Sequence, residues 1–145
     1  MSNYKGPYNS FSQNAEPVYN QNNILGTVSQ SDGVPTGAIV ERGSNVNGEY
    51  VRYADGTQIC TTVALSSSAE TASGNVFVSD LMTFTCPIDF VNNNHKVFVN
   101  MDTTTSAVWP SGRASSSNQI QVRYYRSGSS SAEVSVSCCA IGRWY

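Results

Sequence analysis

The chain has 145 residues, enough for one domain with a substantial core and hardly enough for two. Charged residues make up 12% of it, about half the usual share of a soluble domain, so Ser, Thr, Asn and Gln must supply the polar surface, as in β-rich extracellular or virion proteins. The net charge of -2 argues against nucleic acid as a partner, and the lack of a long apolar run argues against membrane insertion.

The N-terminal segment, residues 1–35, is rich in Asn, Gln and Ser, and its apolar residues show no sustained period. It starts MSNYKGPYNSFSQN, without the apolar centre of a signal peptide, so we expect the protein to stay inside the cell or to leave it by lysis or within a particle. Such a segment cannot bury enough apolar area to fold alone. It is either a disordered tail or an attachment arm ordered by docking. The recurring aromatics favour the arm, with Tyr4, Tyr8, Phe11 and Tyr19 as its docking residues.

From Thr36 onward the sequence predicts short strands joined by polar turns. Strands are expected at residues 37–43, 49–54, 57–65, 76–86, 96–101, 119–125 and 133–141. Asp55-Gly56 predicts a two-residue type I′ hairpin turn, because that turn needs positive φ at both central positions. Polar loops are expected at residues 66–74 and 102–118, and a turn at residues 126–131.

Alternation of apolar and polar residues indicates which faces of these strands are buried. The expected core faces are Met82, Phe84 and Cys86; Ile120, Val122 and Tyr124; and Val134, Val136, Cys138 and Ala140. The return strand after the Asp55-Gly56 turn gathers Ile59, Thr61, Val63 and Leu65 on one face. No helix of ordinary length is visible. The sequence therefore predicts an all-β fold, an antiparallel β-sandwich head at residues 36–145 that follows an extended arm at residues 1–35.

The four cysteines do not form a metal-binding pattern. They lack a CxxC pair, and His95 is the single histidine, so no metal site is expected. Cys138 and Cys139 are neighbours in one strand and should point to opposite faces. Without a signal peptide, buried reduced thiols are favoured over a disulfide framework.

A sandwich of this size leaves strand edges and faces that another copy of the chain could cover. Tyr50, Tyr53, Tyr124 and Tyr125 occupy both faces of their strands, which favours a subunit interface and a homotrimer. The alternative is that these tyrosines simply cover the surface.

Two stretches resemble known families. The run GSNVNGEYVRYADGTQIC, residues 43–60, and its lead-in LGTVSQSDGVPTGAIVERG, residues 25–43, resemble tail-fibre and related proteins of tailed bacteriophages. The C-terminal part is similar to the H-type lectin domain in its strand pattern, with the comparable places filled by Phe84, Phe90, Val97, Val134, Val136, Ala140, Ile141 and Gly142.

The chain departs from the lectin pattern at three places. Cys138 stands where the family has a tryptophan in the final strand, residues 92–95 replace an expected proline, and the turn after Tyr124 has no histidine. The resemblance therefore implies a lectin-like sandwich more strongly than a particular sugar. It also implies a virion protein, assembled in the host cytoplasm, whose arm docks on phage structural proteins of the tail or capsid.

A glycan site needs an aromatic face for the sugar ring and polar groups for its hydroxyls. The side chains expected to meet that need are Trp109, Arg113, Tyr125 and Arg126, in the loop at residues 102–118 and beside the turn at residues 126–131. For Tyr125 and Arg126 the alternative is an ordinary surface position at a strand end. Trp144 is a second aromatic candidate, and it is interpreted first as a core or interface plug.

Catalysis is not expected. His95 lies in the sequence NNNHK, which predicts a solvated turn, and a lone histidine without an orienting group does not make a triad. Asp80 and Asp89 follow no acid–base spacing, and no phosphate loop or other cofactor motif occurs.

Two functions are consistent with these features. The first is a phage fibre or spike whose arm anchors it to the particle and whose trimeric head binds host-surface glycan. The second is a structural decoration or cement protein of the particle with the same arm and trimer and no receptor. An enzyme that degrades host polysaccharide is a more distant alternative.

Overall fold

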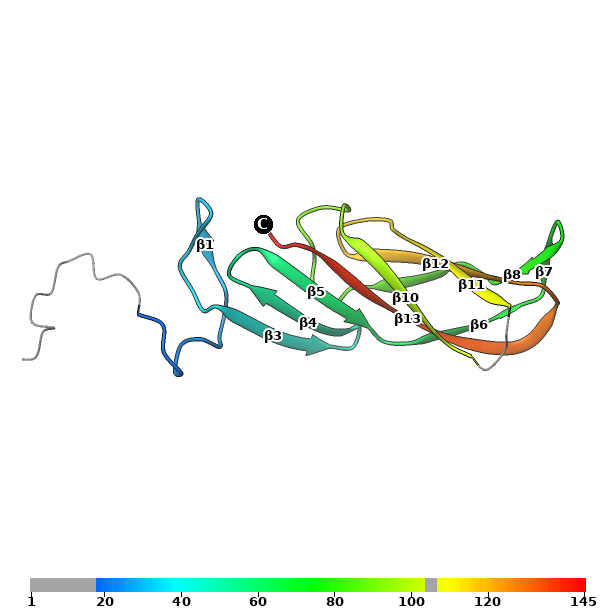
Figure 1. Cartoon of the computed structure of the whole chain (residues 1–145), viewed down its shortest axis with the longest axis horizontal. Coiled ribbons are helices and arrows are strands. Elements are labelled where there is room, and N and C mark those ends of the chain that lie inside the picture. The colour runs from blue at the N-terminus through cyan, green and yellow to red at the C-terminus, as the bar shows by residue number, and fades with distance from the viewer. Residues whose placement is uncertain (1–17, 104–106) are drawn as a thin grey trace, which may run out of the picture.

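The structure is a computed structural model that describes residues 18–103 and 107–145, and within these residues it contains strands and no helix (Figure 1). Two antiparallel sheets form an elongated sandwich-like arrangement, with a small hairpin at one end, which confirms the predicted all-β antiparallel fold. The strands are β1 (Gln30–Ser31), β2 (Val34–Pro35), β3 (Val40–Asn45), β4 (Gly48–Tyr53), β5 (Thr57–Thr62), β6 (Leu65–Ala69), β7 (Thr71–Ser73), β8 (Val76–Val78), β9 (Met82–Thr85), β10 (Lys96–Asp102), β11 (Val108–Ala114), β12 (Gln119–Arg126) and β13 (Ser130–Arg143).

The first sheet is organised around β13. Its strand order is β10-β13-β5-β4-β3, and β6 also pairs with β13. β13 is 14 residues long and runs along the long axis of the molecule (Figure 1). It pairs with β10 from Lys96 to Asp102, with β5 near its C-terminal end and with β6 near its N-terminal end.

The second sheet is organised around β12. Its strand order is β11-β12-β8-β7, and β9 pairs with the first half of β12. β11 is an edge strand, and Pro110 within it has no N–H to offer to another strand. Residues 79–81 divide the run expected at residues 76–86 into β8 and β9.

The core lies between the two sheets. All three predicted core faces are buried there, which confirms the period-two interpretation of these strands. Tyr124 is fully buried and donates a hydrogen bond from its hydroxyl to the Ser67 carbonyl at 2.7 Å. It is therefore a core residue and is not available to a subunit interface. The buried cluster comprises Cys60, Ala69, Met82, Phe84, Cys86, Phe90, Ile120, Val122, Tyr124, Val134, Val136, Cys138 and Ala140.

The inner face of β5 carries a buried polar side chain, Gln58, next to the buried thiol of Cys60. Gln58 is fully buried, and its amide donates to the carbonyls of Ile88 and Asp89 at 3.4 and 3.2 Å. Its side-chain oxygen accepts a hydrogen bond from Arg52 at 2.8 Å. Because the Gln58 amide is satisfied in this way, its burial is tolerated. Ile59, the next residue, consequently points to the outer face of the first sheet.

Polar composition concealed three strands. Residues 66–74 were expected to form a loop and contain most of β6 and all of β7, and residues 102–118 were expected to form a loop and contain β11. Gly43 was expected to end a strand and lies inside β3, where the ring of Tyr50 occupies the space that a Cβ atom would need. These expectations were wrong because Ser, Thr and Gly can occupy a strand whose side chains face solvent or a neighbouring ring.

The turn at Asp55-Gly56 joins β4 to β5, and its predicted type is wrong. Gly56 has a φ of 90°, Asp55 does not have positive φ, and the Gly56 amide donates to the Tyr53 carbonyl at 3.0 Å. Three residues, 54–56, therefore connect the strands. The Thr57 amide donates to the Asp55 carboxylate at 2.8 Å, and this hydrogen bond lowers the pKa of Asp55.

A two-residue turn of the expected type occurs elsewhere, at Asp32-Gly33. Both residues have positive φ, 50° and 82°, and they join β1 to β2. This hairpin lies in residues 18–35, where no strand was expected. The segment contacts the first sheet: Val28 is buried, its amide donates to the Glu41 carboxylate at 2.9 Å, and Leu25 bridges Val40. Residues 1–17, about half of the predicted arm, lie outside the described residues.

The four cysteines are free thiols. Cys60, Cys86 and Cys138 are buried in the core, whereas Cys139 is half-buried on the opposite face of β13, as the strand period predicts. A hydrogen bond with the Cys60 thiol, together with burial, raises the pKa of Cys86. Burial also raises the pKa of Cys138, to about 12. These two thiols therefore stay protonated at neutral pH.

Candidate functional site

The strongest candidate site is a strip of six side chains on the outer face of the second sheet, formed by β11 and β12. The strand register places three cross-strand pairs in successive rows: Trp109 with Tyr125, Ser111 with Arg123, and Arg113 with Gln121. The intervening residues of β12 are buried in the core, so the strip faces away from it. We call this surface the aromatic–arginine strip.

One end of the strip is aromatic. The rings of Trp109 and Tyr125 are nearly parallel, at 17°, and their centroids lie 6.4 Å apart. Trp109 is 43% exposed, near the start of the edge strand β11. An exposed indole beside a second ring offers an apolar platform with polar edges, which suits the apolar face of a sugar ring.

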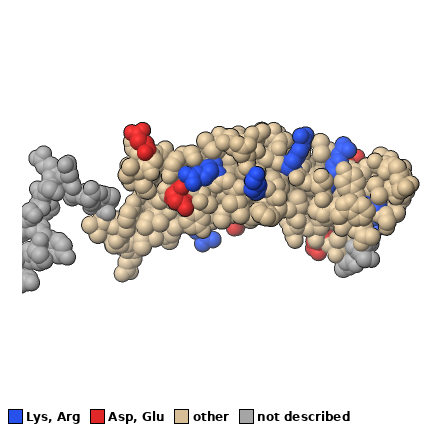
Figure 2. All heavy atoms as spheres, turned by 45° about the horizontal axis from the view of Figure 1, so that its top comes forward, with Lys and Arg blue, Asp and Glu red and all other residues tan. Residues whose placement is uncertain are grey.

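The other end of the strip is basic. Arg113 donates to the side-chain oxygen of Gln121 at 3.0 Å, and Arg123 lies one row closer to the aromatic pair. Among the described residues, no acidic side chain forms an ion pair with either arginine. A hollow of about 300 Å³ lies here, lined by Leu81, Ser111, Arg113, Gln121, Arg123 and Tyr125. Figure 2 shows that charged side chains are sparse on this view of the molecule and that the basic ones are spaced along it, with uncharged surface between them.

Three of the four predicted glycan-binding residues come together in this strip: Trp109, Arg113 and Tyr125. Arg126 does not join them. It follows Tyr125 in β12, so the alternation of the strand directs it to the opposite face, in register with Val108 and Phe77, which pack against the core.

Sequence reasoning missed four residues of the strip and its hollow: Leu81, Ser111, Gln121 and Arg123. The signal was present in the alternation of residues 109, 111 and 113 and of residues 121, 123 and 125. It was overlooked because residues 102–118 were interpreted as a loop, in which alternation has no meaning.

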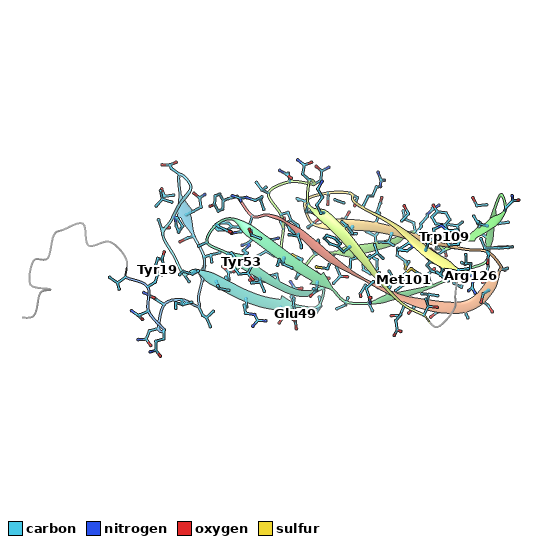
Figure 3. All side chains as sticks on the ribbon, in the orientation of Figure 1. Tyr19, Glu49, Tyr53, Met101, Trp109 and Arg126 are labelled. Atoms are coloured by element: carbon cyan, nitrogen blue, oxygen red, sulfur yellow. The ribbon has the colours of Figure 1, made fainter. Side chains whose placement is uncertain are left out.

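Tyr19, one of the predicted attachment residues, and the strip lie in different halves of the molecule. Figure 3 places Tyr19 and Tyr53 in the half that carries the β1–β2 hairpin, and Trp109 and Arg126 in the other half. Tyr19 is 38% exposed, and its hydroxyl donates to the Gly37 carbonyl at 3.4 Å. The other predicted docking residues, Tyr4, Tyr8 and Phe11, lie outside the described residues.

The outer face of the first sheet carries an apolar row. Ile141, Ile59 and Val51 are cross-strand neighbours on β13, β5 and β4. Phe98 on β10 is 57% exposed on the same face, one row away, where it pairs with Cys139. A shallow hollow of about 500 Å³ adjoins the row, with Arg42 and Glu49 in its lining. Exposed apolar side chains gathered on one sheet face are typical of a contact surface.

His95 is buried, so the predicted solvated turn is wrong at this residue. Its ring stacks on Phe90, with centroids 4.2 Å apart, and its Nδ1 lies 3.3 Å from the Asn92 carbonyl. Its Nε2 is buried without a hydrogen-bond partner among the described residues. Desolvation by burial lowers the pKa of His95. No hydroxyl or carboxylate of the described residues is hydrogen-bonded to the ring, so the geometry does not assemble a triad around it.

Trp144 and Tyr145 pack on the β4–β5 turn. The Trp144 indole donates to the Tyr53 carbonyl at 2.8 Å, and the Tyr145 hydroxyl donates to the Ala54 carbonyl at 3.4 Å. Arg52 lies over the Trp144 ring at 5.6 Å. Trp144 therefore fastens the C-terminus to the β4–β5 turn; it is half-buried and outside the core cluster, so it is not a core plug.

Within residues 18–103 and 107–145, no helix has the length and apolar character needed to cross a membrane. In the same part of the chain, no three His, Cys, Asp or Glu side chains are grouped so that they could hold a metal ion. No family model, no curated protein and no solved structure matches the chain. The function therefore has to be argued from the strip and the faces described above.

Proposed function

We propose that this protein is a fibre or spike protein of a bacteriophage particle and that it binds host-surface glycan through the aromatic–arginine strip. The observation that carries the proposal is the exposed Trp109–Tyr125 pair next to arginines that have no acidic partner among the described residues. In this proposal the role is binding without catalysis, and no cofactor takes part.

The chemistry of the strip supports a sugar ligand. Aromatic rings remove water from the apolar face of a pyranose, and arginine, serine and glutamine side chains form hydrogen bonds with hydroxyl groups. The strip is open and lies on a rigid sheet, so its side chains are held in position before a ligand arrives. A long polymer chain could enter such an open surface from either end, as host polysaccharides require.

The N-terminal segment and the aromatic–arginine strip lie in different halves of the molecule, and this separation supports anchoring through the N-terminal segment. The N-terminal segment, with Tyr19, would dock on tail or capsid proteins, and the strip in the other half of the molecule would then point away from the particle (Figure 3). The resemblance of residues 25–60 to phage fibre sequences supports the same placement.

A homotrimer is part of this proposal, and the apolar outer face of the first sheet supports it. Copies that bury Phe98 and Ile141 against one another would remove exposed apolar surface from water. The Phe98→Glu variant should then sediment as a monomer and keep its β-sheet circular dichroism, whereas the unchanged chain should sediment as a trimer.

Glycan arrays with the purified full chain test the binding function. We expect the unchanged chain to bind host-derived glycans, and the Trp109→Ala variant to lose at least about 2 kcal/mol of binding free energy if the indole is a true anchor. Tyr53→Ala is the matched control, because Tyr53 is an exposed aromatic in the other half of the molecule and is 36% exposed. Equal binding by Trp109→Ala and the unchanged chain would refute the site.

The second candidate is a decoration or cement protein of the particle. The apolar face of the first sheet favours it, since that face could serve assembly without any receptor. This function predicts that the protein binds no host glycan on the array and that particles lose stability when the protein is removed.

A further inference from the structure

We propose that the ligand of the aromatic–arginine strip is an acidic saccharide whose carboxylate binds between Arg113 and Arg123. This inference rests on the proposed glycan-binding function and deepens it by naming the charge of the ligand. It uses the part of the strip that lies beyond the aromatic pair.

The two arginines are arranged as a diagonal pair on adjacent strands. Arg123 is opposite Ser111, and Arg113 is opposite Gln121 in the next row. Side chains in such diagonal positions reach one another across a sheet surface. Both line the same hollow of about 300 Å³, so two guanidinium groups border one small volume.

The charges of this pair are not neutralised by the described part of the protein. Arg113 forms a hydrogen bond with the neutral side chain of Gln121, and no described acidic side chain pairs with Arg123. Two like charges side by side on a sheet are unfavourable in the absence of an anion. Only 12% of the residues in the chain are charged, yet two arginines lie side by side here. This concentration of positive charge points to an anionic ligand.

The geometry favours a carboxylate carried on a sugar over a free ion. A guanidinium fork matches the two oxygens of a carboxylate. The rows of the strip are about 7 Å apart, because each strand residue advances the chain by about 3.4 Å. A sugar ring on Trp109 and Tyr125 would therefore place a substituent, or the next residue of a saccharide, beside Arg123. Gln121 and Ser111 would accept or donate hydrogen bonds to the neighbouring hydroxyls.

The inference is tested with two matched probes on the full chain, oligogalacturonate and its methyl ester, by isothermal titration calorimetry. The two probes share one sugar backbone and differ in charge. We expect the ester to bind at least about tenfold more weakly, since charge-assisted hydrogen bonds are roughly twice as strong as neutral ones. Added salt should weaken binding of the acidic probe and leave the ester unaffected.

Single-residue variants test whether Arg113 and Arg123 are responsible for the preference for the acidic probe. Arg113→Gln and Arg123→Gln should each lower affinity for the acidic probe at least about tenfold and leave affinity for the ester unchanged. Arg126→Gln, on the same strand β12 but directed to the face opposite the strip, is the matched control and should change neither. Arg113→Lys and Arg123→Lys keep the positive charge and lose the forked guanidinium group. Their affinity for the acidic probe should therefore lie between that of the unchanged chain and that of the glutamine variants. Melting temperatures within error of the unchanged chain confirm that each variant is folded.

The outcomes separate this inference from the proposed function. If the ester binds as tightly as the acid and binding still requires Trp109, the acidic preference is wrong and the glycan site stands. If both arginine variants bind the acid normally, the carboxylate does not lie between them. If neither these probes nor any array glycan binds in a Trp109-dependent way, both proposals fail.

Discussion

Single residues in this protein take their roles from the strand period, which sends sequence neighbours to opposite faces. Tyr124 is a fully buried core residue, whereas Tyr125 stacks on Trp109 outside the sheet. Cys138 and Cys139 divide in the same way between the core and the outer face of β13. Two identical neighbours therefore have unrelated environments, and substitutions at one say nothing about the other.

His95 should make stability depend on pH. Burial lowers the pKa of His95 from the usual value of 6.5. Just below pH 6.5, the imidazole is therefore protonated more in the unfolded chain than in the folded chain. The stability contributed by the neutral imidazole is present above pH 6.5 and is lost as pH falls through the folded pKa. The slope from this one group cannot exceed about 1.4 kcal/mol per pH unit.

Thermal melts between about pH 7.5 and pH 5.5 bracket the ordinary histidine pKa and measure this effect. The His95→Phe variant keeps an aromatic ring against Phe90 and cannot titrate, so its melting temperature should change less over the same range. Asp55, whose pKa is lowered, titrates at more acidic pH and does not confuse the comparison. Equal pH dependence in the two proteins would contradict the assignment.

Gly56 should resist replacement for two reasons. Its φ of 90° is strained for any residue with a Cβ atom, and that Cβ would lie 2.8 Å from the Tyr145 ring. We expect Gly56→Val to destabilise the protein by roughly 1 kcal/mol or more. Gly128→Val is the control, since a Cβ there meets no atom within 4 Å and φ is not in the left-handed region. Chemical denaturation measures both, and similar midpoints would rule out the turn geometry.

At the scale of whole elements, β11 decides whether the strip exists. Its inner face is shaped by Gly112, where a Cβ atom would lie 2.7 Å from Val99 and 3.3 Å from Val122. Glycine therefore lets the edge strand approach the core closely while Trp109, Ser111 and Arg113 stay outside.

Gly112→Ala should destabilise the sandwich by about 1–3 kcal/mol, because the added methyl group overpacks the contact with Val99. Ser111→Ala, one residue earlier and on the outer face, should have a much smaller effect. Guanidinium denaturation of the two variants provides the measurement. If the Gly112→Ala protein were as stable as the unchanged chain, Gly112 would not pack closely against Val99 of β10.

The sequence predicted those elements whose two faces differ in polarity. β12 and β13 carry apolar residues at every second position, so their buried faces could be predicted. The extent of β13 could not: it covers Ser130–Arg143, beyond the expected residues 133–141 and into the expected turn at residues 126–131. β6, β7 and β11 could not, because Ser, Thr and Gly on an exposed strand give no contrast between faces. The burial of Gln58 and His95 could not be predicted from the sequence either. Gln58 is buried through contacts with residue 88, which is distant in sequence, and the contact of His95 with Asn92 forms only in the folded loop.

At the scale of the whole molecule, the N-terminal segment has two parts that should respond differently to deletion. Residues 18–35 are joined to the first sheet through Val28, which donates to Glu41, and through backbone hydrogen bonds of Ile24 and Gly26 with Val40. The sequence of residues 1–17 contains no pattern that predicts a contribution to the fold.

Removing residues 1–17 should leave the melting temperature unchanged and abolish incorporation into particles, because the proposed docking residues Tyr4, Tyr8 and Phe11 are lost. Removing residues 1–35 should lower the melting temperature as well, because Val28 is buried and its contacts with Glu41 disappear. Differential scanning calorimetry and particle purification measure the two effects. A large loss of stability in the shorter deletion would place residues 1–17 within the fold.

The length and direction of β13 have a mechanical consequence. In the proposed function the protein is held at one end and bound to a cell at the other, so it would be pulled along its long axis, and β13 runs along that axis (Figure 1). Hydrogen bonds of an antiparallel ladder are perpendicular to their strands, so tension along β13 loads its bonds to β10, β5 and β6 in shear and all together. A ladder loaded in this way must break many bonds at once, whereas a peeled hairpin breaks them one by one. We therefore expect the sandwich to withstand tension between its two ends better than tension applied across its sheets.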